Sequence, residues 1–204
     1  MKVYFLEVAI LGLLLGAPAW AHVPYLEDQD FTTSSPFICP SAEQSLAVYS
    51  WLDSASDVDF YRFQVTTSTL FYAGVIVPVF SQYLEFRPSF ALIGAGLSHT
   101  TESLPLKIKP EWGAVIKNDS GATSRKRFYE PFGGKSYYQG PELQLRLQPG
   151  EYTLIYWDPR KRMGDYVAVI GKREIWTRAD TARALKVTPI IRRGGELHLD
   201  KTKK

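Results

Sequence analysis

The sequence predicts an all-β protein, an antiparallel β-sandwich or jelly roll of about seven or eight strands. Short segments that alternate apolar and polar residues recur along the chain, and glycines and prolines separate them. Such segments are typical of antiparallel strands with one face towards solvent. A helical pattern of apolar residues is nearly absent before residue 174, which argues against a fold in which strands and helices alternate.

The clearest strand covers residues 143–147, where three leucines alternate with a glutamine and an arginine. Successive side chains of a strand point to opposite faces, so the leucines share one face and the polar residues share the other. Pro149 and Gly150 follow and predict a turn, in which proline presets φ and glycine adopts a positive φ.

The segment 152–157 is apolar or aromatic on both faces apart from Thr153, which predicts a central strand. A polar, basic loop separates it from residues 165–171, which we expect to return as its hairpin partner. Upstream strands are predicted at 45–52, 59–65, 70–77 and 89–93.

One helix is predicted after residue 174. Thr177 with Asp180 three residues later matches a capping box. We expect four apolar residues to share one face of this helix, namely Trp176, Ala179, Ala182 and Leu185.

The basic residues gather at the C-terminal end of the chain. From residue 172 onward there are ten lysines and arginines against four acidic residues, a net charge of +6. The preceding body, residues 22–171, carries a net charge of −3. A basic tail on an acidic body suits an anionic membrane surface or a cell-wall polymer, and equally suits a solvated tail that aids solubility. The acidic body argues against a nucleic-acid partner.

The first 21 residues predict a secretory signal peptide. Lys2 precedes a mainly apolar run that ends near Leu15, and an Ala-Trp-Ala sequence closes the segment at Ala21. Cleavage there leaves 183 residues, which we divide into a sandwich domain at 22–171 and a basic extension with a short helix at 172–204. We expect a periplasmic or extracellular protein, and the lone Cys39 provides no internal disulfide.

Two short motifs carry a resemblance to a known family. The sequence LQPGEY ends at Tyr152 and resembles a tyrosine corner, with Pro149 and Gly150 in its turn. The sequence DVDFYRFQV, residues 57–65, is similar to a strand of bacterial pre-peptidase C-terminal domains. The resemblance implies a β-sandwich that serves as a non-catalytic accessory module, which in some members binds calcium or a polymeric substrate.

An aromatic segment between residues 128 and 141 is a candidate binding surface. It interleaves aromatic residues with glycines, and Tyr129, Tyr137 and Tyr138 are its candidate ligand-binding side chains. Aromatic rings bury the apolar faces of sugars while their polar ends stay wet. The alternative is that the rings plug one end of the sandwich.

His22 becomes the first residue of the mature chain if the leader is removed after Ala21. A free α-amine and an imidazole can chelate one copper ion together, as in copper monooxygenases and periplasmic copper carriers, which the N-terminal histidine resembles. These families need a second histidine, and His99 is the better candidate. The alternative is a histidine left at the cleavage site without a role.

Asp57 and Asp59 are candidate calcium ligands, because calcium prefers hard oxygen donors. They are equally explained as turn residues that bond to local backbone. A hydrolase whose carboxylates meet only in the fold also stays open.

Three functions therefore follow from the sequence. The leading one is an exported, non-enzymatic protein that binds a polysaccharide, cell-wall polymer, anionic membrane surface or envelope protein. The alternatives are a copper-binding protein or copper-dependent oxidase that uses His22, and a hydrolase.

Overall fold

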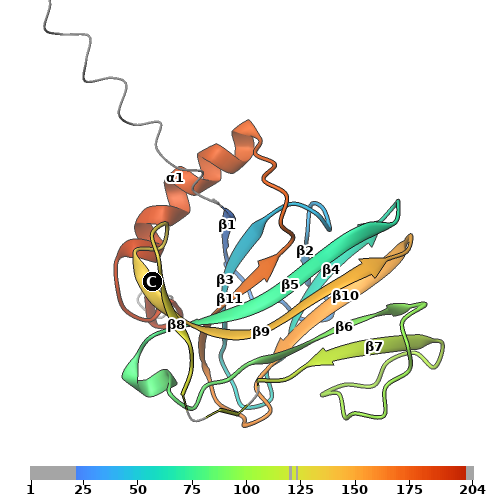
Figure 1. The fold of residues 1–204 in the computed structure, drawn as a ribbon. Coiled ribbons are helices and arrows are strands. Elements are labelled where there is room, and N and C mark those ends of the chain that lie inside the picture. The colour runs from blue at the N-terminus through green and yellow to red at the C-terminus, as the bar shows by residue number, and fades with distance from the viewer. Residues whose placement is uncertain (1–21, 120, 123, 201–204) are drawn as a thin grey trace, which may run out of the picture.

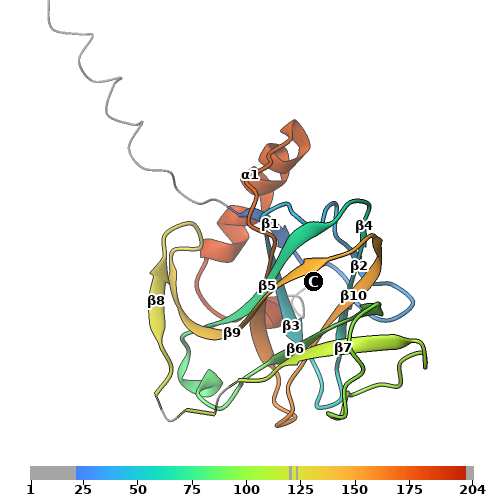
Figure 2. The same ribbon diagram turned by 45° about the vertical axis from the view of Figure 1, so that its right-hand side comes forward.

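The structure is a computed structural model that describes residues 22–119, 121–122 and 124–200. The predicted leader, residues 1–21, lies outside the described residues. The described chain forms two β-sheets, A and B, that pack face to face. Helix α1 (Arg178–Arg192) lies beside sheet A (Figures 1 and 2). The predicted β-sandwich is therefore confirmed.

Sheet A has six strands, and its spatial order brings distant parts of the chain together. In that order the strands are β1 (Val23–Leu26), β3 (Leu46–Leu52), β11 (Gly164–Ile170), β5 (Thr69–Pro78), β9 (Lys135–Leu147) and β8 (Arg127–Glu130). The pairs are antiparallel except for β1 with β3, which is parallel.

Sheet B has five strands. In spatial order they are β2 (Phe37–Ile38), β4 (Asp59–Val65), β10 (Gly150–Trp157), β6 (Ser89–Ala95) and β7 (Trp112–Lys117). Its pairs are antiparallel except for β2 with β4. The short β1, β2, β7 and β8 lie at or next to sheet edges and were not among the predicted strands, because brief pairings leave little periodicity in the sequence.

The core between the sheets takes one face of each strand. Leucine, valine and phenylalanine side chains fill it, together with buried tyrosines such as Tyr61, Tyr156 and Tyr166. The pattern predicted for residues 143–147 holds, because Leu143 and Leu147 are buried and the intervening polar residues are exposed. Every buried tyrosine hydroxyl needs a partner, so Tyr156 donates to the Gly74 carbonyl at 3.1 Å.

Strands β3 and β11 are buried on both faces. Their inward side chains join the core. The side chains of Ala47, Tyr49, Val167 and Val169 face the other side and form part of a second apolar cluster, which we call the outer cluster. Such near-continuous apolar sequences are typical of strands covered on both sides. The outer face of sheet A is therefore buried where β3 and β11 lie.

The expected hairpin of residues 152–157 with 165–171 is wrong. The first segment is β10 in sheet B and the second is β11 in sheet A, so the loop between them crosses the sandwich. Both segments are apolar on both faces, and each pairs with two neighbours of its own sheet. Strand β10 does lie centrally, between β4 and β6, as predicted.

The crossing from β9 to β10 contains the tyrosine-corner sequence. The Tyr152 hydroxyl donates to the Gln148 carbonyl at 3.0 Å, which is the contact that a tyrosine corner makes. The expected positive φ at Gly150 is absent, because Gly150 already belongs to β10 and pairs with Val65.

Helix α1 begins as predicted, because Thr177 and Asp180 form a capping box. The four apolar residues that were expected to share one face do not form the packed side of the helix. Leu185 is 75% exposed, and the other three residues of that face are also exposed. The helix instead packs Ile191 and its partly buried neighbours Val187 and Ile190 into the outer cluster of sheet A.

Two further short helices complete the described chain. They are the 3₁₀ helix η1 (Ser81–Tyr83) and α2 (Leu197–Asp200). The buried Asp165 carboxylate holds α2 by accepting from the backbone N–H groups of Leu197 and His198. Within the described part of the chain, no helix combines the length and apolar character needed to cross a membrane.

Candidate functional site

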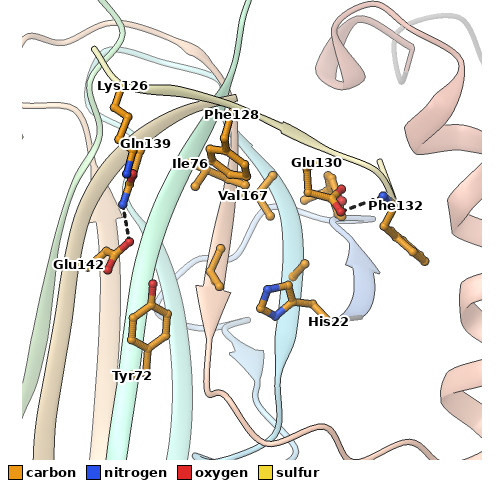
Figure 3. Close-up of a pocket in the computed structure, with 13 residues that line it drawn as sticks. His22, Tyr72, Ile76, Lys126, Phe128, Glu130, Phe132, Gln139, Glu142 and Val167 are labelled. Atoms are coloured by element: carbon orange, nitrogen blue, oxygen red, sulfur yellow. Dashed lines mark hydrogen bonds between the residues drawn. The ribbon is translucent and has the colours of Figure 1, made fainter. Parts of the chain in front are cut away.

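The first candidate site is a cavity of about 320 Å³ on the outer face of sheet A, which we call the outer pocket. Small side chains of β3 and β11 form its floor, and the β8–β9 hairpin overhangs it (Figure 3). It is lined by His22, Ala47, Tyr49, Tyr72, Ile76, Lys126, Phe128, Glu130, Phe132, Gln139, Glu142, Val167 and Val169. An apolar floor with a few polar groups at its rim is the usual composition of a ligand pocket.

Hydrogen bonds from two sides hold the β8–β9 turn at the edge of the outer pocket. Glu130 accepts hydrogen bonds from the backbone N–H groups of Phe132 and Gly133, which tie the turn to the end of β8. Arg192 of α1 donates to the carbonyls of Phe132 and Pro131, at 2.7 and 3.1 Å. The overhang is thus braced from both sides.

His22 lines the outer pocket and takes part in one hydrogen bond of 2.6 Å, between its Nδ1 and the Ser45 hydroxyl. Burial lowers the pKa of His22, although Glu130 and Glu174 act in the opposite sense. The lowered pKa favours the neutral imidazole, which is the form in which histidine binds a metal.

The structure does not bring His99 to His22. His99 is exposed in the connection between β6 and β7 of sheet B and does not line the outer pocket. The third histidine, His198, pairs instead with Asp165 at 2.7 Å. Among the described residues, His22 belongs to no cluster of three metal-ligating side chains, so copper binding stays a prediction.

The three tyrosines proposed as a stacking surface lie in different environments. Tyr129 is 62% exposed, whereas Tyr137 and Tyr138 are buried. Tyr137 and Tyr138 are neighbours on β9, so they point to opposite faces of sheet A, Tyr138 into the core and Tyr137 into the outer cluster. The structure therefore presents no common surface formed by all three rings.

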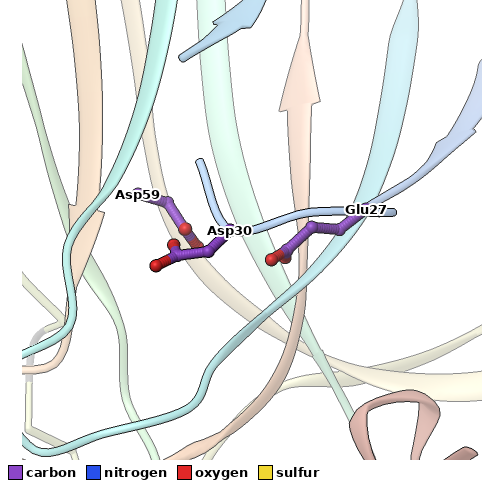
Figure 4. Close-up of side chains that lie close together, drawn as sticks. All are labelled: Glu27, Asp30 and Asp59. Carbon is purple, nitrogen blue, oxygen red and sulfur yellow. The ribbon is translucent and has the colours of Figure 1, made fainter. Parts of the chain in front are cut away.

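A second candidate site is a group of three carboxylates, which we call the carboxylate cluster. Glu27 follows β1, Asp30 lies in the next loop, and Asp59 begins β4 (Figure 4). One carboxylate oxygen of each lies within 4.8 Å of the others. The loop reaches β4 because the Phe60 N–H donates to the Phe31 carbonyl at 2.7 Å.

Asp59 is fully buried and only half satisfied. Its Oδ2 accepts from the Tyr166 hydroxyl at 2.6 Å, and hydroxyl contacts continue from there to Tyr61 and Ser50. Its Oδ1 has no hydrogen-bond partner among the described residues. Burial raises the pKa of Asp59, and the neighbouring acids, among them Asp30, raise it further. A cation here would relieve both the repulsion and the unpaired oxygen.

The predicted partner Asp57 is not part of this cluster. Its Oδ2 accepts from the Asp53 N–H at 2.7 Å, the local bond expected of a turn residue. The sequence analysis missed Glu27 and Asp30 because they are remote from Asp59 in the chain. No local pattern marked Glu27, because the strand β1 that precedes it was itself not predicted.

A third candidate site lies beside the outer pocket and is basic. This cavity of about 290 Å³, which we call the arginine pocket, is lined by Arg87, Asp119, Ala122, Ser124, Arg125, Lys126, Gln139 and Gly140. Arg87 is buried and pairs with Asp119 at 2.8 Å. Arg125 donates from Nη1 to the carbonyls of Tyr83 and Phe86 and lies over the Tyr138 ring at 4.3 Å.

A wider hollow of about 780 Å³ lies on sheet B, beside the tyrosine corner. Its lining includes the exposed side chains of Arg62, Gln64 and Glu151. Ion pairs made by solvent-exposed charged side chains contribute little free energy. The outer pocket, with its apolar floor, is therefore the stronger candidate.

The comparisons with known proteins give structural likeness only. No protein-family model matches the chain, and no curated protein matches it by sequence. Among solved structures, the pre-peptidase C-terminal domain of a Bacillus anthracis collagenase matches at 11% identity and a TM-score of 0.39. That match covers 66% of this chain and 93% of the collagenase domain. This collagenase domain is a member of the family that the two sequence motifs resemble.

Two further solved structures match more loosely. PliG, a periplasmic inhibitor of g-type lysozyme from Salmonella Typhimurium, is 15% identical with a TM-score of 0.32, over 72% of this chain and 96% of PliG. CorA, a surface-associated copper-binding protein of Methylomicrobium album BG8, is 7% identical with a TM-score of 0.28, over 75% of this chain and 99% of CorA. At these scores the matches carry no functional argument.

Proposed function

We propose that this protein is an exported, non-enzymatic binding protein that takes an apolar group of its partner into the outer pocket. The observation that carries the proposal is the cavity of about 320 Å³ with a floor of Ala47, Val167 and Val169. The predicted leader supports export.

The composition of the outer pocket selects among the partners expected from the sequence. Sugars need several hydrogen-bonding groups to replace the water that they lose. The floor offers none, and two rim carboxylates are already engaged, Glu130 by backbone N–H groups and Glu142 by the Gln139 amide at 2.8 Å. An acyl chain or an apolar side chain suits this cavity better than a polysaccharide.

The carboxylates brought together by the fold do not favour hydrolysis. Glu27 and Asp59 are 2% and 0% exposed, so a substrate cannot reach them. A glycosidase needs two carboxyl groups that flank an accessible bond. Binding therefore explains the arrangement better than catalysis.

Two neighbouring residues of β8 provide a matched test of the outer pocket. Phe128 lines the cavity, whereas the adjacent Tyr129 does not. We expect Phe128→Ala to weaken the binding of 1-decanol, measured by titration calorimetry, by about tenfold, because apolar contact area is lost. Tyr129→Ala should leave the affinity unchanged.

The same titration can contradict the proposal. An absence of saturable decanol binding to the wild-type protein would overturn it. An equal loss in both variants would do the same, and a loss confined to Tyr129→Ala would restore the exposed tyrosine as the contact residue.

We also propose that the carboxylate cluster holds a hard divalent cation, calcium. The unpartnered Oδ1 of the buried Asp59 supports this, together with a donor set made only of oxygen atoms. At a calcium concentration one hundred times the dissociation constant, the free energy of unfolding should rise by about 2.7 kcal/mol.

Asp59→Asn and Asp57→Asn separate this cation site from a general effect of calcium. The first removes a charge from the carboxylate cluster, and the second removes a charge outside it. We expect Asp59→Asn to abolish the calcium-dependent rise in melting temperature and Asp57→Asn to retain it. A rise of equal size in both variants would rule out this site.

A further inference from the structure

The arginine pocket adjoins the outer pocket, because Lys126 and Gln139 line both cavities. Figure 3 shows these two side chains together at one end of the outer pocket. An apolar cavity and a basic cavity therefore share one boundary.

The arginine pocket carries more positive charge than its own acid balances. Arg87, Arg125 and Lys126 line it, against the single carboxylate of Asp119. That carboxylate already pairs with Arg87 and accepts from the Gly121 N–H. The excess positive charge of this lining therefore favours the binding of an anion.

Three guanidinium nitrogens in this region have no hydrogen-bond partner among the described residues. They are Nε of Arg87 and both Nε and Nη2 of Arg125. Buried N–H groups are costly to leave unpaired, and a guanidinium matches the two oxygens of a carboxylate. Arg125 is held in place by its bonds to two carbonyls, so it is preorganised to receive such a group.

We propose that the protein binds an amphipathic anion, whose apolar body fills the outer pocket and whose carboxylate or similar head group binds Arg125 and Lys126. The inference rests on the proposed function, because it assigns the ligand class of the same pocket. It is carried by the shared boundary and by charge complementarity.

The test compares two probes that differ only in the head group, decanoate and 1-decanol, below the concentrations at which they aggregate. We expect the wild-type protein to bind decanoate about tenfold or more tightly than decanol, as a charge-assisted hydrogen bond predicts. Decyltrimethylammonium, with the opposite charge, should bind more weakly than decanol.

Arg125→Gln and Arg127→Gln form a matched pair of variants. Arg127 also lies over the Tyr138 ring, at 5.0 Å, but lines neither cavity. Arg125→Gln should remove the preference for decanoate and retain decanol binding, whereas Arg127→Gln should keep the preference. Lys126→Gln serves as a second variant, because Arg125→Gln also removes two hydrogen bonds to backbone and can impair folding.

The outcomes separate this inference from the proposed function. If neither decanoate nor decanol binds, both are overturned. If both bind with equal affinity, or if the two arginine variants behave alike, only the anionic ligand is overturned. Binding to phosphatidylglycerol vesicles without binding of free decanoate would also overturn it, in favour of an anionic membrane surface.

Discussion

The carboxylate cluster and the arginine pocket are two partly buried charged regions of opposite sign. Both contain polar atoms without a partner among the described residues, namely Oδ1 of Asp59 and three guanidinium nitrogens. The carboxylate cluster stands apart from the outer pocket, and tyrosine hydroxyls lie behind Asp59. The arginine pocket instead borders an apolar cavity through Lys126.

This difference shows that the surroundings of a charged group decide what can balance it. Three carboxylates with oxygens within 4.8 Å of one another form a donor set of oxygen atoms, which suits one hard cation. The arginine pocket borders a cavity with an apolar floor, so its counter-ion can carry an apolar body. The same physical demand, neutralising a buried charge, thus leads to two different ligand classes.

The largest effect is expected for Asp59→Ala in the calcium-saturated protein. The free energy of unfolding should fall by about 4 kcal/mol, of which about 2.7 is lost cation binding and the rest the hydrogen bond to Tyr166. Urea denaturation with and without a chelator measures both parts. A loss that is identical in the two conditions would break the comparison, because Asp59 would then have only a hydrogen-bonding role.

Arg87→Ala should cost somewhat less, about 2 to 3 kcal/mol, because it leaves the partly buried Asp119 without its cation. The double variant with Asp119→Ala should lose less than the sum of the two single variants. Urea denaturation of the four proteins gives the interaction energy. Strict additivity would show that this pair does not stabilise the arginine pocket.

Asp57, in the loop before β4, should also give the calcium-free protein a pH-dependent stability. Burial chiefly raises the pKa of Asp57 to about 6, so the folded state holds this proton more tightly than the unfolded chain. The contribution of Asp57 to the free energy of unfolding is therefore fully present below the unfolded pKa of about 3.9. It is lost as the pH rises through about 6. Asp57→Asn should flatten the fall in unfolding free energy across this window, and an unchanged profile would contradict the assignment.

The smallest effect is expected for Arg127→Gln. This exposed arginine lies outside both cavities, so the free energy of unfolding should change by about 0.5 kcal/mol or less. Thermal denaturation of Arg127→Gln and Arg125→Gln under the same conditions compares their stabilities. A large loss in Arg127→Gln would mean that the two arginines share one structural role over the Tyr138 ring.

Local patterns predicted much of the fold correctly. Alternation predicted the strand 143–147, and the capping box placed the N-cap of α1 at Thr177, because both signals depend on residues close in the chain. The strand partners were harder, and the expected hairpin of β10 with β11 was wrong. A segment that is apolar on both faces does not reveal which sheet it joins.

The candidate sites depended even more on tertiary structure. His22, Asp59 and the aromatic segment were singled out by residue type, and each lies at or near a cavity or cluster. Glu27 and Arg125 were missed, because their partners are distant in the chain or are backbone carbonyls. The predicted pairs of His22 with His99, and of Asp57 with Asp59, were not assembled into one site.

The order of residues by itself determined that this chain forms strands with a core, because the two-residue period places apolar side chains on one face wherever it recurs. It also determined a basic tail on an acidic body. Tertiary structure alone decided that β3 and β11 are covered on both faces, and that Lys126 stands between an apolar and a basic cavity. The physical reason is that burial and charge pairing act between residues that meet only when the two sheets have closed.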